Sequence, residues 1–196
     1  MDKLIDQIIS RIFIELEASG RHVHLTEEAS IALFGHRLSE KRPLSQPGQF
    51  VCNERISLVT EKGRFDNVAI LGPERKECQV ELSMTDCVTL GITAPIRQSG
   101  STENSAGIIL EANGKRLTLS SGVIVAQRHI HMTPQDAELR RLQDGDTVKL
   151  RTLTKRPVTF ENVTVRVSPK YRTYAHLDYD EANACGFCKG DMGLIV

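Results

Sequence analysis

The chain has 196 residues, 40% of them hydrophobic, which is enough to bury the core of one domain or of two small ones. Its 25 basic residues equal its 25 acidic residues, and with 5% aromatic residues and no Trp this balance argues against a nucleic-acid-binding module. No apolar run approaches the roughly 20 residues that span a bilayer, and the charged N-terminus lacks a secretory core, so we expect a cytoplasmic protein without a membrane segment.

The first predicted element is an amphipathic helix over residues 2 to about 12. Its apolar residues recur at helical spacing, at Leu4, Ile5, Ile8, Ile9 and Ile12. Such a helix either docks on the body of its own protein or binds a groove on a partner. The spacing favours neither reading.

A six-residue phrase then occurs twice. Residues 21–26 read RHVHLT and residues 128–133, 107 positions later, read RHIHMT. Acidic residues and an alanine follow the final threonine of each phrase, which predicts an N-capped helical turn after Thr26 and after Thr133. We interpret the chain as an internal duplication.

The repeat continues at a shorter offset. Residues 65–68 (FDNV) align with residues 160–163 (FENV), 95 positions later, and Leu82, Asp86 and Gly91 align with Leu177, Glu181 and Gly186. The first copy therefore has twelve extra residues. They fit the Pro-containing stretch of residues 37–50, which we expect to be a surface loop.

Short runs that alternate apolar and polar residues follow, at residues 79–83 and 163–167. Frequent Gly and Pro residues separate such runs, a pattern typical of strands in small barrels or sandwiches. The fold is therefore predicted to be mainly β, with few helices.

The repeat register also places Glu81 opposite His176. In an extended segment the two histidines of an H-x-H pair face the same side, so each copy offers two converging imidazoles and one further metal-competent group. Both combinations, two histidines with a glutamate and three histidines, occur at catalytic zinc ions with an open position. The candidate ligand sets are His22, His24 and Glu81 in one copy, and His129, His131 and His176 in the other.

The remaining histidine and the five cysteines give weaker signals. His36 has no neighbouring ligand in the sequence, and we interpret it as a surface or packing residue. Because no export signal is present, we expect reduced thiols rather than disulfides. Cys185 and Cys188 form a single CxxC, which we interpret as two thiols near a chain end rather than as a metal or redox site.

Five motifs in order resemble the phosphate propanoyltransferases of the propanediol-utilisation type, the phosphotransacylases associated with bacterial microcompartments. They are RHVHLT, GPERKECQVELSMTD (residues 72–86), APIRQSG (94–100), RHIHM and LDYDEANA (177–184). The resemblance extends over nearly the whole chain from Ser19 onward.

This resemblance implies a fold of two small β-barrels with short capping helices, two zinc ions between them and coenzyme A beside the metals. It implies one barrel from residues 13–20 with 128–196, a second from residues 21–127, and a separate N-terminal helix over residues 1–12. It assigns each ligand set to one zinc ion, and it matches Arg75, in G-P-x-R, to the arginine that holds phosphate.

The implied reaction converts acyl-CoA, with a propionyl or acetyl group, and phosphate into acyl phosphate and CoA. No Ser-His-Asp signature or G-x-S-x-G elbow is present, so direct transfer is favoured over an acyl-enzyme. A zinc-dependent hydrolase and a non-catalytic metal-binding module are the alternatives. The hydrolase would not need phosphate, and the binding module would bind neither phosphate nor CoA.

Several assignments stay open at this point. Arg97 and Asn183 are candidates for contacts with CoA, or else a surface ion pair and a turn residue. Arg21 and Arg128 either order the surroundings of the metals or bind anions. Homo-oligomer formation is also undecided.

The sequence departs from the family pattern at two places. Cys78 stands where we expect a residue such as Thr, on the strand face opposite Glu81, so we do not count it as a ligand. Family members usually have a linker between a targeting helix and the barrel, but here residues 13–16 follow at once. Binding of shell or cargo proteins through residues 1–12, with a place in the microcompartment lumen, is therefore an open alternative to a free cytoplasmic enzyme.

Overall fold

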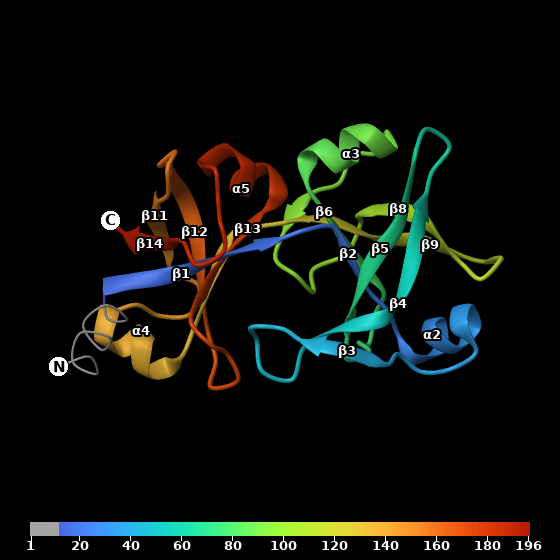
Figure 1. The fold of residues 1–196 in the computed structure, drawn as a ribbon, viewed down its shortest axis with the longest axis horizontal. Coiled ribbons are helices and arrows are strands. Elements are labelled where there is room, and N and C mark those ends of the chain that lie inside the picture. Colours follow the sequence, from blue (N-terminus) through green and yellow to red (C-terminus); the bar gives the residue numbers. More distant parts are fainter. Residues whose placement is uncertain (1–11) are drawn as a thin grey trace. The chain divides into compact units, whose positions relative to one another are not determined.

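A computed structural model describes residues 12–196 (Figure 1). Nearly all of the helix predicted over residues 2–12 therefore lies outside the described residues. The chain divides into two compact units: unit 1 contains the described residues up to Ser19 together with Gln127–Val196, and unit 2 contains Gly20–Ala126. Within residues 12–196 no helix has the length and apolar character needed to cross a membrane.

Unit 1 is a closed six-stranded barrel in the order β1-β13-β10-β12-β11-β14. Alternate residues of its strands point inward, and Ile14, Leu16, Ile130 and Met132 are all at most 2% exposed. The strands are β1 (Phe13–Ser19), β10 (His129–Met132), β11 (Thr147–Leu153), β12 (Thr159–Val167), β13 (Tyr174–Asp178) and β14 (Met192–Ile195).

Unit 2 contains a second closed ring of six strands, in which β4, β5, β2, β6, β9 and β8 pair in that order and β8 pairs again with β4. Strands β3 and β7 extend it beside β4 and β9. The strands are β2 (His22–His24), β3 (Glu40–Pro43), β4 (Phe50–Val59), β5 (Arg64–Gly72), β6 (Gln79–Leu82), β7 (Ile96–Arg97), β8 (Ala106–Ala112) and β9 (Lys115–Ala126).

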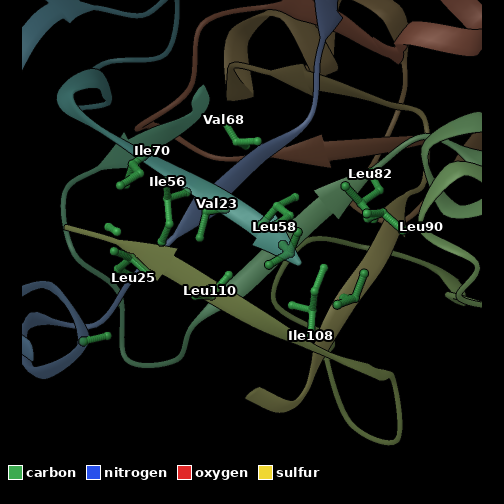
Figure 2. Close-up of a cluster of buried hydrophobic side chains, with 14 of the residues drawn as sticks. Val23, Leu25, Ile56, Leu58, Val68, Ile70, Leu82, Leu90, Ile108 and Leu110 are labelled. Carbon is green, nitrogen blue, oxygen red and sulfur yellow. The ribbon is translucent and has the colours of Figure 1, made fainter. Parts of the chain in front are cut away.

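Apolar side chains from these strands fill the interior of unit 2, as Figure 2 shows for Val23, Ile56, Leu58, Ile70 and Leu110. All five are at most 2% exposed. On β2 the core residue Val23 lies between His22 and His24, so strand alternation sends both histidines to the opposite face. One strand thus supplies both core and site.

Each of four short helices begins at a residue whose side chain caps its first turn. The threonines of the repeated phrases, Thr26 and Thr133, accept hydrogen bonds from the first turns of α2 (Glu27–Phe34) and α4 (Pro134–Arg140), as predicted. Two further helices, α3 (Met84–Leu90) and α5 (Tyr179–Cys185), begin with reciprocal capping boxes and end at a glycine in the left-handed region. The expectation of a mainly β fold with two barrels and few short helices is confirmed.

The loop predicted over residues 37–50 was only partly right. This stretch includes β3, which pairs with the start of β4, from Pro43 opposite Phe50 to Glu40 opposite Cys52. All four β3 residues are exposed. Without a buried face the strand has no apolar alternation, so its sequence resembles a loop.

The pairings show an exchange between the two sequence copies. On β1, Leu16, Glu17 and Ala18 pair in parallel with Ala175, His176 and Leu177 of β13. The repeat-equivalent residues of β9, Val123, Ile124 and Val125, pair in parallel with Val80, Glu81 and Leu82 of β6. The first strand of each copy therefore closes the barrel formed by the rest of the other copy.

Candidate metal centres

The first candidate centre lies on neighbouring antiparallel strands of unit 2. His22 on β2 is directly opposite Glu81 on β6, and His24 follows on the same face of β2. One ligand atom from each of these three side chains lies within 4.8 Å of the other two. All three residues are at most 8% exposed. The structure thus brings this predicted set together.

The distances within the set suit a small cation. Zinc bonds of about 2.0–2.2 Å in a tetrahedral arrangement put neighbouring ligand atoms roughly 3.4 Å apart. Here His22 Nε2 is 3.5 Å from Glu81 Oε2, and His24 Nε2 is 3.9 Å from Glu81 Oε1. Two imidazoles and a carboxylate are also the donor types that zinc accepts, so the residues fit the ion.

Backbone carbonyls fix the orientation of both rings. His22 Nδ1 is 2.8 Å from the carbonyl oxygen of Gly20, and His24 Nδ1 is 3.1 Å from that of Leu71. Because a carbonyl oxygen can only accept, Nδ1 carries the proton in each ring, and in a neutral ring Nε2 then keeps the lone pair that a metal needs.

The pKa shifts at this centre reflect burial and mutual charge. Burial lowers the pKa of His24 well below its ordinary value, and the positive charges of His22 and Arg75 lower it further. Burial acts in the same direction on His22, but the charge of Glu81 and its hydrogen bond outweigh burial and raise the pKa of His22. His24 is therefore a neutral donor at neutral pH.

One hydroxyl group and one side-chain amide orient the Glu81 carboxylate. Ser99 Oγ donates to Glu81 Oε1 at 2.7 Å, and Gln79 Nε2 donates to the same oxygen at 2.5 Å. Arg75 Nη1 in turn donates to Ser99 Oγ at 3.1 Å. The predicted phosphate arginine is thus joined to a predicted metal ligand through one serine.

The second candidate centre repeats this arrangement in unit 1. His129 on β10 is directly opposite His176 on β13, at the positions equivalent to His22 and Glu81. One ring nitrogen from each of His129, His131 and His176 lies within 4.8 Å of the others, so this predicted set is also brought together. His129 Nδ1 is 2.9 Å from the carbonyl oxygen of Gln127, two residues earlier, as His22 is from Gly20.

Two further side chains support the second centre. Glu17 Oε2, on β1, is 3.4 Å from His176 Nδ1 and favours a proton on that nitrogen. The ring of Tyr171 stacks on His131 with centroids 4.0 Å apart. Sequence reasoning missed both residues, and also Ser99 and Gln79. Glu17 corresponds to Ile124 in the other copy, so the repeat could not have indicated it.

The other residues singled out in the sequence, Arg97, Asn183 and Cys78, are not members of either ligand set. Arg97 Nη1 is 4.0 Å from Glu103 Oε2 in unit 2, which agrees with the surface ion-pair reading. Asn183 is exposed on α5 in unit 1, where its carbonyl oxygen accepts a hydrogen bond from Gly186. Cys78 belongs to neither ligand set, and its sulfur instead accepts a hydrogen bond from the Thr26 amide at 3.4 Å.

A family model for phosphate propanoyltransferase matches residues 15–188. This chain belongs to the phosphate propanoyltransferase family. A relative of that name from Enterococcus faecalis is 50% identical over 204 residues, covering 100% of this chain and 97% of the relative. Relatives of the same name from Clostridioides difficile and Listeria monocytogenes are 46% and 51% identical, covering 100% and 98% of this chain and 97% and 93% of the relatives.

The phosphate propanoyltransferase match includes the six candidate ligands and Arg75. Membership of this acyltransferase family confirms the resemblance read from the five motifs. The roles of the individual ligands, and the expectation that two zinc ions share one site between the barrels, stay predictions.

Proposed function

We propose that the chain is a phosphate acyltransferase, which interconverts propionyl-CoA or acetyl-CoA plus phosphate and the corresponding acyl phosphate plus CoA. The observation that carries this proposal is the connection from Arg75 through Ser99 to Glu81. It joins a guanidinium suited to phosphate with a buried set of metal ligands. The names of the relatives support the same reaction.

We further propose that each ligand set holds one zinc ion. A zinc ion with three protein ligands supplies a Lewis acid for a thioester carbonyl, or a ligand position for the CoA sulfur. The neutral His24 and the anionic Glu81 are already in the protonation states that metal binding requires. The three-histidine set contains no carboxylate, so it would bring no negative charge to a bound ion.

Arg75 has the chemical role of holding phosphate. Its planar fork binds two phosphate oxygens at once, and its contact with Ser99 directs the side chain toward Glu81. In the transfer, a phosphate oxygen forms a bond to the carbonyl carbon, the bond from carbon to sulfur breaks, and CoA leaves as a thiolate. We propose direct transfer, because no nucleophile with an adjacent base is evident in the sequence.

We also propose how the chain binds CoA, where shell or cargo proteins would bind, and which acyl groups it accepts. Arg97 and Asn183 stay our candidates for CoA contacts, and residues 1–12 stay the candidate segment for shell or cargo binding. Acetyl and propionyl groups differ by one methylene, which a hydrophobic pocket distinguishes by only about 1–3 kcal/mol. We therefore propose that both acyl groups are substrates.

The first test follows CoA release from propionyl-CoA with a thiol reagent. The protein is assayed with and without phosphate, as purified, after chelation, and after zinc is added back. We expect release only when phosphate and metal are both present. Release that is indifferent to phosphate would indicate the hydrolase, and no release at all would indicate a binding module.

The second test changes the proposed phosphate ligand by Arg75→Lys. Because a lysine cannot reproduce the planar fork, we expect kcat/KM for phosphate to fall about 10²-fold. Arg116→Lys is the matched control, since Arg116 is an exposed surface residue of unit 2 paired with Glu111, and it should leave activity unchanged. Equal kinetics for both variants would contradict the role given to Arg75.

A further inference from the structure

The arginine that opens each repeated phrase has the same kind of partner in both units. In unit 2, Arg21 Nη2 and Nε donate to Asp86 Oδ1 at 2.6 and 3.1 Å. The Arg21 guanidinium also lies over the Phe65 ring, with its carbon 4.1 Å from the centroid. The Asp86 side chain is only 5% exposed, so this pair is largely shielded from water on the carboxylate side.

Unit 1 repeats these contacts at the equivalent positions. Arg128 Nη1 donates to Glu181 Oε1 at 2.8 Å, and Arg128 Nε donates to the carbonyl oxygen of Glu161 at 2.8 Å. Its guanidinium carbon lies 5.8 Å from the centroid of the Phe160 ring. An arginine, a carboxylate and a phenylalanine thus recur together, although the acid changes from Asp to Glu.

Each carboxylate divides its two oxygens between the arginine and a helix. Asp86 Oδ2 accepts from the amide of Ser83, the N-cap of α3, while Oδ1 faces Arg21. Glu181 Oε2 accepts from the amide of Asp178, the N-cap of α5, while Oε1 faces Arg128. Each arginine is therefore fastened to the rigid first turn of a helix that directly follows the strand of the third ligand.

The same arginines adjoin the carbonyl groups that orient the first histidine of each set. The Gly20 carbonyl, bonded to the Arg21 nitrogen, accepts from His22 Nδ1 at 2.8 Å. The Gln127 carbonyl, bonded to the Arg128 nitrogen, accepts from His129 Nδ1 at 2.9 Å. Because each peptide group is planar, holding the arginine restricts the direction of the carbonyl before it.

We propose that the pairs Arg21–Asp86 and Arg128–Glu181 position His22 and His129 for metal binding, by fixing the peptide group that orients each ring. Each guanidinium already contacts a carboxylate, so the structure favours this role over the alternative of anion binding. The inference rests on the proposed function, in which the two ligand sets hold metal ions.

The experiment measures metal affinity one site at a time in the full chain. In a His131→Ala background, only the site of unit 2 keeps its complete ligand set, and Zn²⁺ is titrated into chelated protein against a chromophoric chelator. Removing a group that orients a ligand typically costs 10- to 100-fold in metal affinity. We expect that loss from Arg21→Lys, and no change from Arg128→Lys.

A His24→Ala background reverses the test. There Arg128→Lys should weaken the remaining site of unit 1 by 10- to 100-fold, and Arg21→Lys should not change its affinity. Asp86→Glu and Glu181→Asp are conservative controls taken from the chain's own two copies, and each should keep affinity within about threefold. Thermal unfolding of the metal-free variants measures any general loss of stability.

The outcomes separate the two proposals. If the unmodified chain binds two Zn²⁺ ions and neither arginine variant changes an affinity, the positioning role is wrong. If either variant weakens both sites equally, in proportion to a lowered unfolding temperature, its effect is a general one and the positioning role is also wrong. If the unmodified chain binds no Zn²⁺, the proposed metal-dependent function itself fails.

Discussion

Glu81 is a buried carboxylate that stays charged. Burial alone would raise its pKa, but the charge of His22, with hydrogen bonds from His22 and Ser99, holds the pKa of Glu81 well below that of an ordinary glutamate. The residue is therefore an anion throughout the neutral pH range. A buried carboxylate beside two imidazole groups is a place where a divalent cation would be favoured, because buried charges in proteins are paired or coordinate metals.

The cysteines differ enough in their surroundings to give a direct test of the structure. Burial raises the pKa of Cys52 to about 12, and the nearby charges of Glu54 and Glu74 act in the same direction. Because only a thiolate attacks a disulfide reagent, we expect native Cys52 to stay unlabelled at pH 8. Exposed Cys188 should react promptly. Peptide mass spectrometry after labelling measures both, and Cys188→Ser is the control for the fast phase.

Cys52 lies on β4 and is 0% exposed, so prompt labelling of this residue in the native protein would contradict the structure. Cys185, the partner of Cys188 in the CxxC, is buried, and its thiol donates to the Ala182 carbonyl at 3.4 Å. No candidate metal group among residues 12–196 includes either cysteine. The reading of these residues as ordinary thiols stays a prediction that the same labelling experiment can address.

At the residue scale, repetition makes the ligand sets predictable. Two H-x-H phrases and one shared register are enough to identify all six candidate side chains from the sequence. The supporting residues Ser99 and Tyr171 carry no such signal, because their partners are distant in the chain and no equivalent residue repeats the contact. Long-range hydrogen bonds and ring stacking depend on the folded backbone, which a single sequence does not display.

Two of the three glycines in the hairpin of β8 and β9, Gly107 and Gly114, are required for different reasons. Asn113 and Gly114 form its two-residue turn, both with positive φ, in the Asn-Gly pattern that such turns prefer. Gly107 lies beside a register shift in the same pair of strands. A Cβ atom at Gly107 would lie 2.5 Å from the Leu119 carbonyl oxygen, so the two backbones approach closely there.

We therefore expect Gly107→Ala to destabilise the protein more than Gly114→Ala. A backbone atom must move at Gly107, with a cost of about 2–3 kcal/mol in the free energy of unfolding. At Gly114 no atom lies within 4 Å, and only the left-handed backbone is unfavourable, with a cost of about 1 kcal/mol. Urea unfolding of both variants measures the difference. The reverse order would show that the close approach is not present.

At the scale of single helices and strands, an element could be predicted where its own residues carry a signal, such as a capping side chain or an apolar alternation. The capping residues Thr26 and Thr133 predicted two helix starts, and the alternation of apolar and polar residues predicted β6 and part of β12. Strand β3 could not be foreseen, because its exposed residues, including Pro43, have no preferred face. Such a strand is held by backbone hydrogen bonds to the edge of β4, and its side chains show no apolar alternation from which it could be predicted.

At the scale of the whole molecule, β1 is the strand on which barrel closure in unit 1 depends. It lies between β13 and β14 and contributes buried Ile14 and Leu16 to the core. The residues that surround it are more than a hundred positions away in the sequence. The pairing of β1 with β13 and β14 was indicated only by the resemblance to a family. A short strand whose partners are distant in the sequence carries no local signal that says which strands it will pair with.

A chain that begins at Gly20 should therefore lose the barrel of unit 1 but keep the strands of unit 2. Without β1, the facing edges of β13 and β14 have no partner, and two large core residues are missing. Hydrogen exchange followed by mass spectrometry should show fast exchange in β13 and β14, with protection retained in β4 and β5. A chain beginning at residue 12 is the matched control, and equal protection in both chains would contradict the prediction.

The exchange of first strands also bears on how such a chain could have arisen. The residues equivalent to β1 in the second copy occupy the end of β9, so the sequence boundary between copies lies inside one long strand. A half-length ancestor with this pattern could close its barrel only with the first strand of another identical chain. In a single polypeptide the two copies can carry different third ligands at equivalent positions, as Glu81 and His176 show.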